Sequence, residues 1–183
     1  MLAACVGLAS VSVACGGATA PRTLVDVGDS LAVGTHPYLA DLLRDWELSS
    51  AAAVGRRSDE GLEVLRSLAP SLPRVVVVSL GTNDNPADSA RFASTVDEVI
   101  AIAGPDRCVV WATIARPAVR GVSYAAFNRI LRSEAKRSRS FKVVDWAAMV
   151  VRNPSLLRSD RVHPIASGYR ARAVETARAV RLC

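Results

Sequence analysis

Residues 74–84 of the chain read RVVVVSLGTND. Four consecutive valines give this stretch an apolar, β-branched centre, which is typical of a strand that is buried on both faces. A shorter run of the same kind, residues 23–27, directly precedes the sequence GDSL at residues 28–31. Each run therefore ends at a polar motif, and the carboxyl ends of strands in an open α/β sheet are where ligands bind.

Strand-like and helix-like segments alternate along the chain beyond these two runs. We expect strands over residues 23–27, 46–52, 74–80, 107–114 and 141–144, and helices over 31–44, 58–68, 88–103, 123–137 and 164–180. Gly34 and Pro37 predict a short loop at the start of the first helix. Ser58 is expected to cap the second helix, and Pro164 suits the first position of the last helix. Repeated units of this length imply parallel strands joined by right-handed crossovers. The predicted fold class is α/β, a three-layer α/β/α arrangement around about five parallel strands.

The length of 183 residues suits one domain with a substantial core. Half of the residues are hydrophobic and 22% are charged, which excludes a disordered or fibrous chain. We expect residues 22–183 to form that domain and residues 1–21 to be an export leader or a lipoprotein signal.

Three separated motifs supply the groups that acyl transfer through an activated hydroxyl requires. They offer Ser30 as nucleophile, Asn83 as an oxyanion donor, and Asp160 with His163 as a carboxylate and a base. A serine hydroxyl needs a base that can accept its proton as it attacks. An imidazole suits this role near neutral pH, because its ordinary pKa is about 6.5. The other histidine, His36, is expected to have no nearby carboxylate partner to orient it, so we expect it at the surface or at the rim of a pocket.

These motifs resemble, in order, the blocks of the GDSL or SGNH hydrolases, a superfamily of serine esterases and lipases with a flavodoxin-like fold. Residues 28–31 resemble the nucleophile block, Gly55 the glycine of the second block, residues 81–84 the third block, and Asp160 with His163 the last block. The stretch at residues 143–146, followed by residues 160–168, is similar to SGNH domains of bacterial envelope proteins. The resemblance implies a catalytic set of Ser30, Asp160 and His163.

The same resemblance implies an oxyanion hole formed by the backbone N–H groups of Ser30 and Gly55 and by the side-chain amide of Asn83. Each such donor is worth about 3 kcal/mol in the transition state. No cofactor is implied.

Two arginines depart from the family pattern. Arg161 stands where the family often has glycine, and Arg56 follows Gly55. If they line the pocket, they favour an anionic or polyhydroxylated substrate; the alternative is that both side chains point into solvent. No insertion is long enough to form a lid, which favours small acyl groups or an exposed polymer ester.

The formal net charge of +6 comes almost entirely from arginine. Its densest stretch, residues 129–142, would suit an anionic polymer or a membrane surface, but the absence of interleaved aromatic residues favours a solvated helix face. No nucleic-acid module signature is present, so we expect no nucleic-acid partner.

Residues 1–21 carry no charge and are rich in small residues, as in an export leader. A membrane-spanning helix is the alternative, although the small and polar residues make it weak. Cys15, within the sequence SVACGG, resembles the cysteine of a bacterial lipoprotein box, whose lipidation would attach the chain to a membrane through its N-terminus. We therefore expect an exported protein, secreted or held in the cell envelope.

Removal of the leader would leave Cys108 and Cys183, which form either a disulfide in an oxidising compartment or two free thiols. Their spacing fits no zinc motif, and with two histidines in the chain we expect no metal site.

The sequence thus predicts a monomeric serine carboxylic-ester hydrolase that acts on a small-molecule, glycan or lipid ester of the envelope. Three alternatives stay open: an O-acyltransferase, a thioesterase or lysophospholipase with the same catalytic set, and a catalytically silent carbohydrate-binding module.

Overall fold

The computed structural model describes residues 21–183. Its five strands are β1 (Thr23–Gly28), β2 (Glu47–Ala52), β3 (Val75–Ser79), β4 (Cys108–Ala112) and β5 (Phe141–Val144). Its helices are α1 (Ser30–Leu42), α2 (Ser58–Leu68), α3 (Ser89–Ala103), α4 (Ala125–Arg137), α5 (Trp146–Arg152) and α6 (Ala166–Arg181), with 3₁₀ turns η1 (Ala69–Ser71) and η2 (Pro154–Leu156). The predicted leader at residues 1–21 and Cys15 lie outside the described residues, apart from residue 21.

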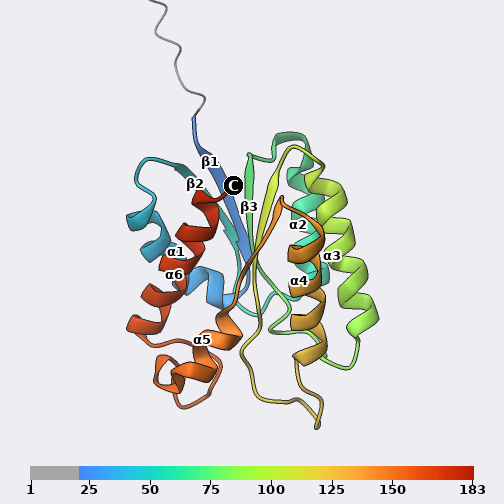
Figure 1. Cartoon of the computed structure of the whole chain (residues 1–183), viewed down its shortest axis with the longest axis vertical. Coiled ribbons are helices and arrows are strands. Elements are labelled where there is room, and N and C mark those ends of the chain that lie inside the picture. The colour runs from blue at the N-terminus through green and yellow to red at the C-terminus, as the bar shows by residue number, and fades with distance from the viewer. Residues whose placement is uncertain (1–20) are drawn as a thin grey trace, which may run out of the picture.

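All strand pairs are parallel, and the sheet order is β2-β1-β3-β4-β5. The helices α1 and α6 cover one face of the sheet, and α2, α3 and α4 cover the other (Figure 1). This arrangement confirms the predicted three-layer α/β/α fold with five parallel strands.

The valine run forms β3 at the centre of the sheet, and all five of its residues are buried. Its side chains alternate between the two layers. Val76 and Val78 pack with α2, α3 and α4, while Val75 and Val77 pack with α1 and α6. A central strand covered on both faces is why this run lacks the polar alternation of a half-exposed strand.

The sheet order places a topological switch point between β1 and β3, because the chain builds β2 on one side of β1 and β3 on the other. Ligands of such sheets bind in the crevice outside the carboxyl ends of the two strands at the switch point. Ser30 follows β1 and Asn83 follows β3, so both candidate residues belong to this edge.

The expected break near the start of α1 is wrong. The helix begins at Ser30 and runs without interruption through Gly34 and Pro37. A Cβ at position 34 would lie 2.3 Å from the ring of Tyr169, so glycine lets α1 pack closely against α6. Pro37 lies on the exposed side of α1, where the helix tolerates it because tertiary packing outweighs propensity.

The predicted boundaries that differ from the structure include the starts of two other helices. Arg57, rather than Ser58, is the residue before α2, and α6 begins at Ala166 because Pro164 pairs with Leu157 in an isolated β-bridge. The short helix α5 was not predicted. It begins at Trp146, whose side chain is fully buried, and the carboxylate of Asp145 accepts a hydrogen bond from the backbone N–H of Ala148.

The expectation that His36 lacks a carboxylate partner is also wrong. Nδ1 of His36 lies 3.8 Å from the carboxylate of Asp26, which is buried in the middle of β1. This distance is too long for a hydrogen bond, and the contact is an ion pair only when the imidazole is protonated. The Asp26 carboxylate raises the pKa of His36, and partial burial opposes that rise. The partner was hidden because it lies ten residues earlier, on another element.

Cys108 and Cys183 form a disulfide, with their Cα atoms 5.7 Å apart. Cys108 is the first residue of β4 and Cys183 follows α6, so the bridge lies at the amino edge of the sheet, opposite the candidate site. No helix within residues 21–183 combines the length and the apolar character needed to cross a membrane.

Candidate active site

Ser30 is the first residue of α1 and sits in a tight turn after β1. The carboxylate of Asp29 accepts a hydrogen bond from the backbone N–H of Leu31 at 2.9 Å, and the N–H of Asp29 donates to the carbonyl of Ser79 at 3.0 Å. A Cβ at Gly28 would lie 2.4 Å from the Cβ of Ala32. The glycine therefore allows the turn to present Ser30 at the strand end.

Ser30, His163 and Asp160 lie in contact in the structure. Oγ of Ser30 is 3.1 Å from Nε2 of His163, and Nδ1 of His163 is 2.8 Å from Oδ2 of Asp160. The Asp160 carboxylate accepts a hydrogen bond from Nδ1–H, which leaves Nε2 free to accept a hydrogen bond from the hydroxyl of Ser30. The three residues form a chain of donors and acceptors that ends at the serine oxygen.

Backbone N–H groups of the residues that follow Asp160 stabilise the ionised form of its side chain. Its Oδ1 accepts hydrogen bonds from the backbone N–H groups of Val162 and His163, both at 2.9 Å. The Val162 contact, followed by the His163 side chain and backbone, lowers the pKa of Asp160 to about 2. Its side chain is 47% exposed, so the charge is also hydrated.

The loop that carries Asp160 and His163 is closed by backbone contacts on either side. The N–H of Arg158 donates to the carbonyl of His163 at 2.8 Å, and the N–H of Ile165 donates to that of Leu156 at 2.9 Å. Arg161 sits at the turn with a φ of 58°. These contacts fix the imidazole relative to the start of α6.

Asn83 and Gly55 come together from the loops after β3 and β2. Nδ2 of Asn83 donates to the carbonyl of Arg56 at 3.1 Å, which uses one of the two amide hydrogens and leaves the other. Gly55 has a φ of 79°, and nothing lies within 4 Å of a Cβ built there. Glycine is therefore favoured at this position by the backbone conformation, not by space.

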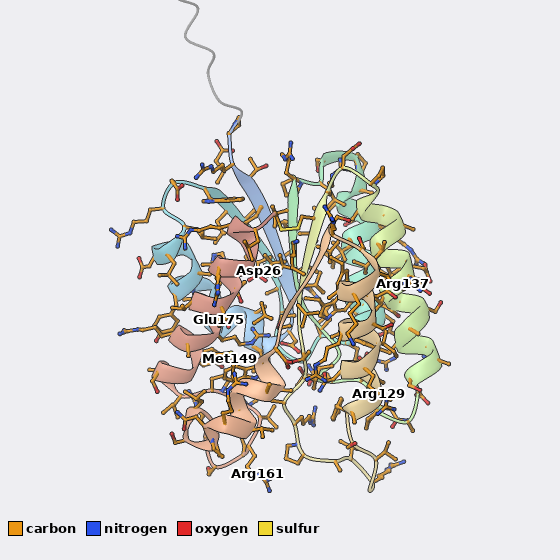
Figure 2. All side chains as sticks on the ribbon, in the orientation of Figure 1. Asp26, Arg129, Arg137, Met149, Arg161 and Glu175 are labelled. Carbon is orange, nitrogen blue, oxygen red and sulfur yellow. A yellow bond between two sulfur atoms is a disulfide. The ribbon has the colours of Figure 1, made fainter. Side chains whose placement is uncertain are left out.

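The two arginines that depart from the family pattern have different environments. The guanidinium of Arg56 donates to the carbonyls of Ala51 and Gly28, so this side chain joins the ends of β2 and β1 and is half-buried. Arg161 is exposed and projects from the end of the molecule that carries the site (Figure 2).

A hollow of about 400 Å³ opens between the loop after β4, helix α5 and the loop before His163. We call it the apolar hollow, because Ile114, Val150 and Leu157 are among its lining residues, with Arg116 and Arg161 as its cations. The hydroxyl of Tyr124, also in its wall, donates to the carbonyls of Thr82 and Asp84. The Tyr124 side chain therefore fixes the position of the segment that carries Asn83.

Beneath Ser30 lies a buried charged network that was not predicted from the sequence. Arg172 of α6 is 3% exposed and donates to Oγ1 of Thr35 at 3.1 Å and to Oγ of Ser79 at 2.8 Å. Burial raises the pKa of Asp29 while the charge of Arg172 opposes that rise, and burial lowers the pKa of Arg172. Arg172 thus joins α6 to α1 and β3, the elements next to His163, Ser30 and Asn83.

Nothing in the sequence distinguishes Arg172 from the neighbouring arginines of α6. A signal was available only in Asp26, a lone carboxylate inside an otherwise apolar strand, which requires a buried partner. Among residues 21–183, no three His, Cys, Asp or Glu side chains are grouped so that they could hold a metal ion.

Known proteins provide an independent comparison. The model of the family described as GDSL-like lipase/acylhydrolase matches residues 26–171. No curated protein sequence matches the chain significantly.

Several solved structures share the fold. The C-terminal catalytic domain of peptidoglycan O-acetyltransferase A from Streptococcus pneumoniae superposes with a TM-score of 0.73 at 21% identity, covering 88% of this chain and 93% of that one. A lipolytic G-D-S-L protein from Veillonella parvula has a TM-score of 0.73 at 17% identity, covering 86% and 97%. A lipase/acylhydrolase from Enterococcus faecalis has a TM-score of 0.68 at 22% identity, covering 86% and 94%.

Proposed function

Since the chain belongs to the GDSL-like lipase/acylhydrolase family, we propose that it is a serine carboxylic-ester hydrolase that forms an acyl-enzyme on Ser30. One observation carries the proposal: the continuous contact from Oγ of Ser30 through the imidazole of His163 to the carboxylate of Asp160. This is the arrangement that makes a weakly nucleophilic hydroxyl reactive at neutral pH.

In the first half of the reaction, Oγ of Ser30 attacks the ester carbonyl while Nε2 of His163 takes the hydroxyl proton. The tetrahedral intermediate then collapses: the bond to the alkoxy oxygen breaks, and His163 gives its proton to the leaving alcohol. In the second half, a water molecule attacks the acyl-enzyme, His163 takes a proton from it, and Ser30 leaves with that proton. Asp160 keeps the imidazole in the required tautomer and stabilises the imidazolium.

The negative oxygen of each intermediate would be stabilised by the backbone N–H groups of Ser30 and Gly55 and by Nδ2 of Asn83. The contact of Asn83 with the Arg56 carbonyl orients the amide before substrate binds. Donors fixed in advance cost no reorganisation during the reaction, which is why they are effective.

We assign short acyl esters of an envelope glycan or lipid as the substrates. The apolar hollow is large enough for a small acyl group, and Arg116 and Arg161 supply positive charge in its wall. The fold shared with a peptidoglycan O-acetyltransferase domain and the leader-like sequence at residues 1–21 support an envelope location. Lipidation of Cys15 would attach the enzyme to a membrane, and we expect a monomer.

An O-acyltransferase is the second candidate, and the shared fold with an acetyltransferase domain favours it. It would form the same acyl-enzyme but pass the acyl group to a sugar hydroxyl instead of water. A thioesterase or lysophospholipase would differ in the leaving group. A silent carbohydrate-binding module would not need Ser30, His163 and Asp160 in contact.

The proposal is tested with p-nitrophenyl esters of two to twelve acyl carbons, assayed with and without an added sugar acceptor. We expect the highest kcat/KM for the shortest chains and free carboxylic acid as the product. Ser71→Ala, a serine on η1 far along the sheet from the site, serves as control for Ser30→Ala. Acyl transfer to the sugar in preference to water would select the transferase, and the absence of any turnover would contradict both candidates.

A further inference from the structure

A second hollow, of about 330 Å³, lies beside Asn83. It is formed by the amino ends of α2 and α3 and the loop after β3, whereas the apolar hollow is formed by the loop after β4, α5 and the loop before His163. We call it the polar hollow, because its accessible side chains are charged or amides. They include Arg57, Asp59, Asn83, Asp84, Asp88 and Arg91.

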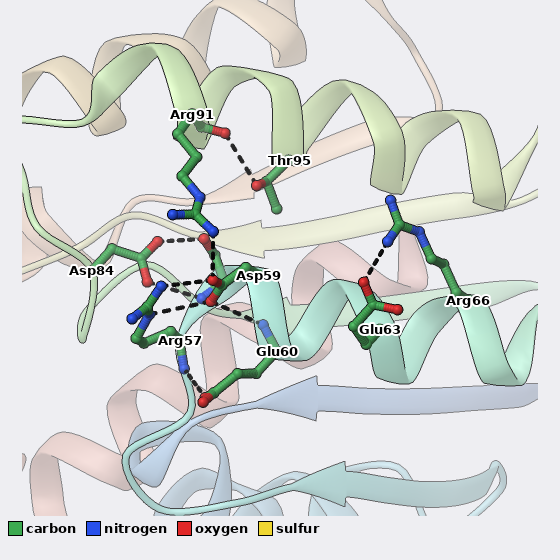
Figure 3. Close-up of polar contacts among 9 residues, drawn as sticks. Arg57, Asp59, Glu60, Glu63, Arg66, Asp84, Arg91 and Thr95 are labelled. Atoms are coloured by element: carbon green, nitrogen blue, oxygen red, sulfur yellow. Dashed lines mark hydrogen bonds and ion pairs between the residues drawn. The ribbon is translucent and has the colours of Figure 1, made fainter.

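The charged side chains of the polar hollow hold one another in place (Figure 3). Asp59 accepts hydrogen bonds from Nε and Nη2 of Arg57 at 3.2 and 2.6 Å, and from Nη2 of Arg91 at 2.8 Å. Asp84 accepts from the backbone N–H and the hydroxyl of Ser58. The donors and acceptors are therefore fixed before a ligand arrives, which lowers the entropic cost of binding.

Hydrogen-bonding capacity remains for a ligand. A guanidinium has five N–H donors, and Arg91 uses one of them on Asp59. The Arg91 side chain is 65% exposed and that of Arg57 is 49% exposed, so the remaining donors reach solvent. Asp88 and Asp84 add carboxylate acceptors along the same rim.

The chemistry of this lining selects the class of ligand. Three carboxylates and two guanidiniums nearly balance, so neither a strongly anionic nor a strongly cationic ligand is favoured. The aromatic residues at its floor, Phe92 and Phe127, are 1% and 0% exposed, so most of the accessible lining is polar and suits an acyl chain poorly. Closely spaced donors and acceptors with little net charge are complementary to a neutral compound that carries many hydroxyl groups.

We propose that the polar hollow binds the sugar hydroxyls of the alcohol part of the ester. The inference rests on the proposed function and adds a substrate class to it: an acylated carbohydrate rather than a simple alkyl ester. Asn83 supplies the link, because it lines the polar hollow and is the side-chain donor assigned to the oxyanion. A sugar held there would lie beside the side chain that is assigned to the oxyanion.

The chain offers a matched control for this proposal. Arg91 of α3 reaches across to Asp59 of α2, and Arg66 of α2 reaches across to Glu98 of α3, so each arginine joins the same two helices by an exposed ion pair. Arg66, which also contacts Glu63, lies further along α2 and outside the polar hollow (Figure 3). Loss of either pair should change stability by a similarly small amount.

The experiment compares the wild type, Arg91→Ala, Asp88→Ala and Arg66→Ala on two substrates, glucose pentaacetate and p-nitrophenyl acetate. The readout is the ratio of kcat/KM for the sugar ester to kcat/KM for the aryl ester. We expect this ratio to fall about tenfold in Arg91→Ala and Asp88→Ala, mainly through a higher KM for the sugar ester, and to be the same in Arg66→Ala as in the wild type. Circular dichroism melting establishes that the variants are folded.

An unchanged ratio in both Arg91→Ala and Asp88→Ala would overturn the inference, as would an equal fall in Arg66→Ala. A wild-type enzyme that hydrolyses p-nitrophenyl acetate but not glucose pentaacetate would overturn it while leaving the proposed function intact. Hydrolysis of neither ester by the wild type would overturn the proposed function itself.

Discussion

Nε2 of His163 lies 3.1 Å from Oγ of Ser30, although 133 residues separate the two in the sequence. The contact exists because α1, which Ser30 begins, packs against α6, which follows His163. Arg172 reinforces that packing from inside the molecule. The geometry of the candidate site therefore depends on the packing of α1 against α6.

The geometry predicts the pH dependence of kcat/KM. Only a neutral imidazole can accept the serine proton, so kcat/KM should rise in one step from acid to neutral pH. Asp160 should add no second step above about pH 4, since its pKa is lowered from 3.8 to about 2 and it is already ionised there. A pH-rate profile of p-nitrophenyl acetate hydrolysis measures this. Two ionisations on the acid side, or a flat profile between pH 5 and 8, would contradict the assignment.

Asn83→Ala should lower kcat about 10²- to 10³-fold and change KM little, because its amide acts mainly on the charge that develops in the transition state. Steady-state kinetics with p-nitrophenyl acetate measures the two constants separately. Asn153→Ala, at an exposed position after α5, is the control. A kcat within threefold of the wild type would remove Asn83 from the oxyanion hole.

Arg172→Met should destabilise the fold by about 3–5 kcal/mol, because it leaves the buried Asp29 carboxylate without its neighbouring positive charge. Urea unfolding measures the loss. Arg170→Met, two residues earlier on the exposed side of α6, should cost less than about 1 kcal/mol.

The same network predicts coupling between two substitutions. Asp29→Asn removes the charge that Arg172 compensates, so the double variant should be more stable than the sum of the single losses implies. Strict additivity would mean that Arg172 and Asp29 do not interact.

Reduction of the disulfide should destabilise the fold and leave catalysis unchanged. Cys108 and Cys183 close a loop of 75 residues, which the chain-entropy model values at about 4 kcal/mol. Reduction should lower the melting temperature, while kcat should stay the same because the bridge lies at the opposite edge of the sheet from Ser30. Digestion without reductant should give one linked peptide with both cysteines; two free thiols in the oxidised protein would contradict the bridge.

The sequence was sufficient for the elements whose signal is local. The valine run of β3 and the two strand-motif junctions predicted the parallel sheet and the edge at which Ser30 and Asn83 lie. Local signals were misleading at Gly34 and Pro37, because the packing of α1 on Tyr169 outweighs their tendency to break a helix.

The features that could not be predicted depend on long-range contacts. Residues from different elements meet in the contact of His36 with Asp26, in the hydrogen bonds of the buried Arg172 and in the contact of Asn83 with the Arg56 carbonyl. Neither periodicity nor composition indicates which side chains of different helices and strands come into contact. The environment of Arg56 could not be predicted for the same reason, since its carbonyl partners become neighbours only in the folded sheet.

The central claim, that Ser30 is a nucleophile activated by His163, is tested most directly by labelling the protein with a fluorophosphonate and locating the adduct by mass spectrometry. We predict one adduct, on the peptide that contains Ser30, formed much more slowly in His163→Ala and not at all in Ser30→Ala, with hydrolysis lost in both variants by about 10⁴-fold or more. An adduct on another residue, or a Ser30→Ala variant that keeps a tenth of the wild-type activity, would contradict it.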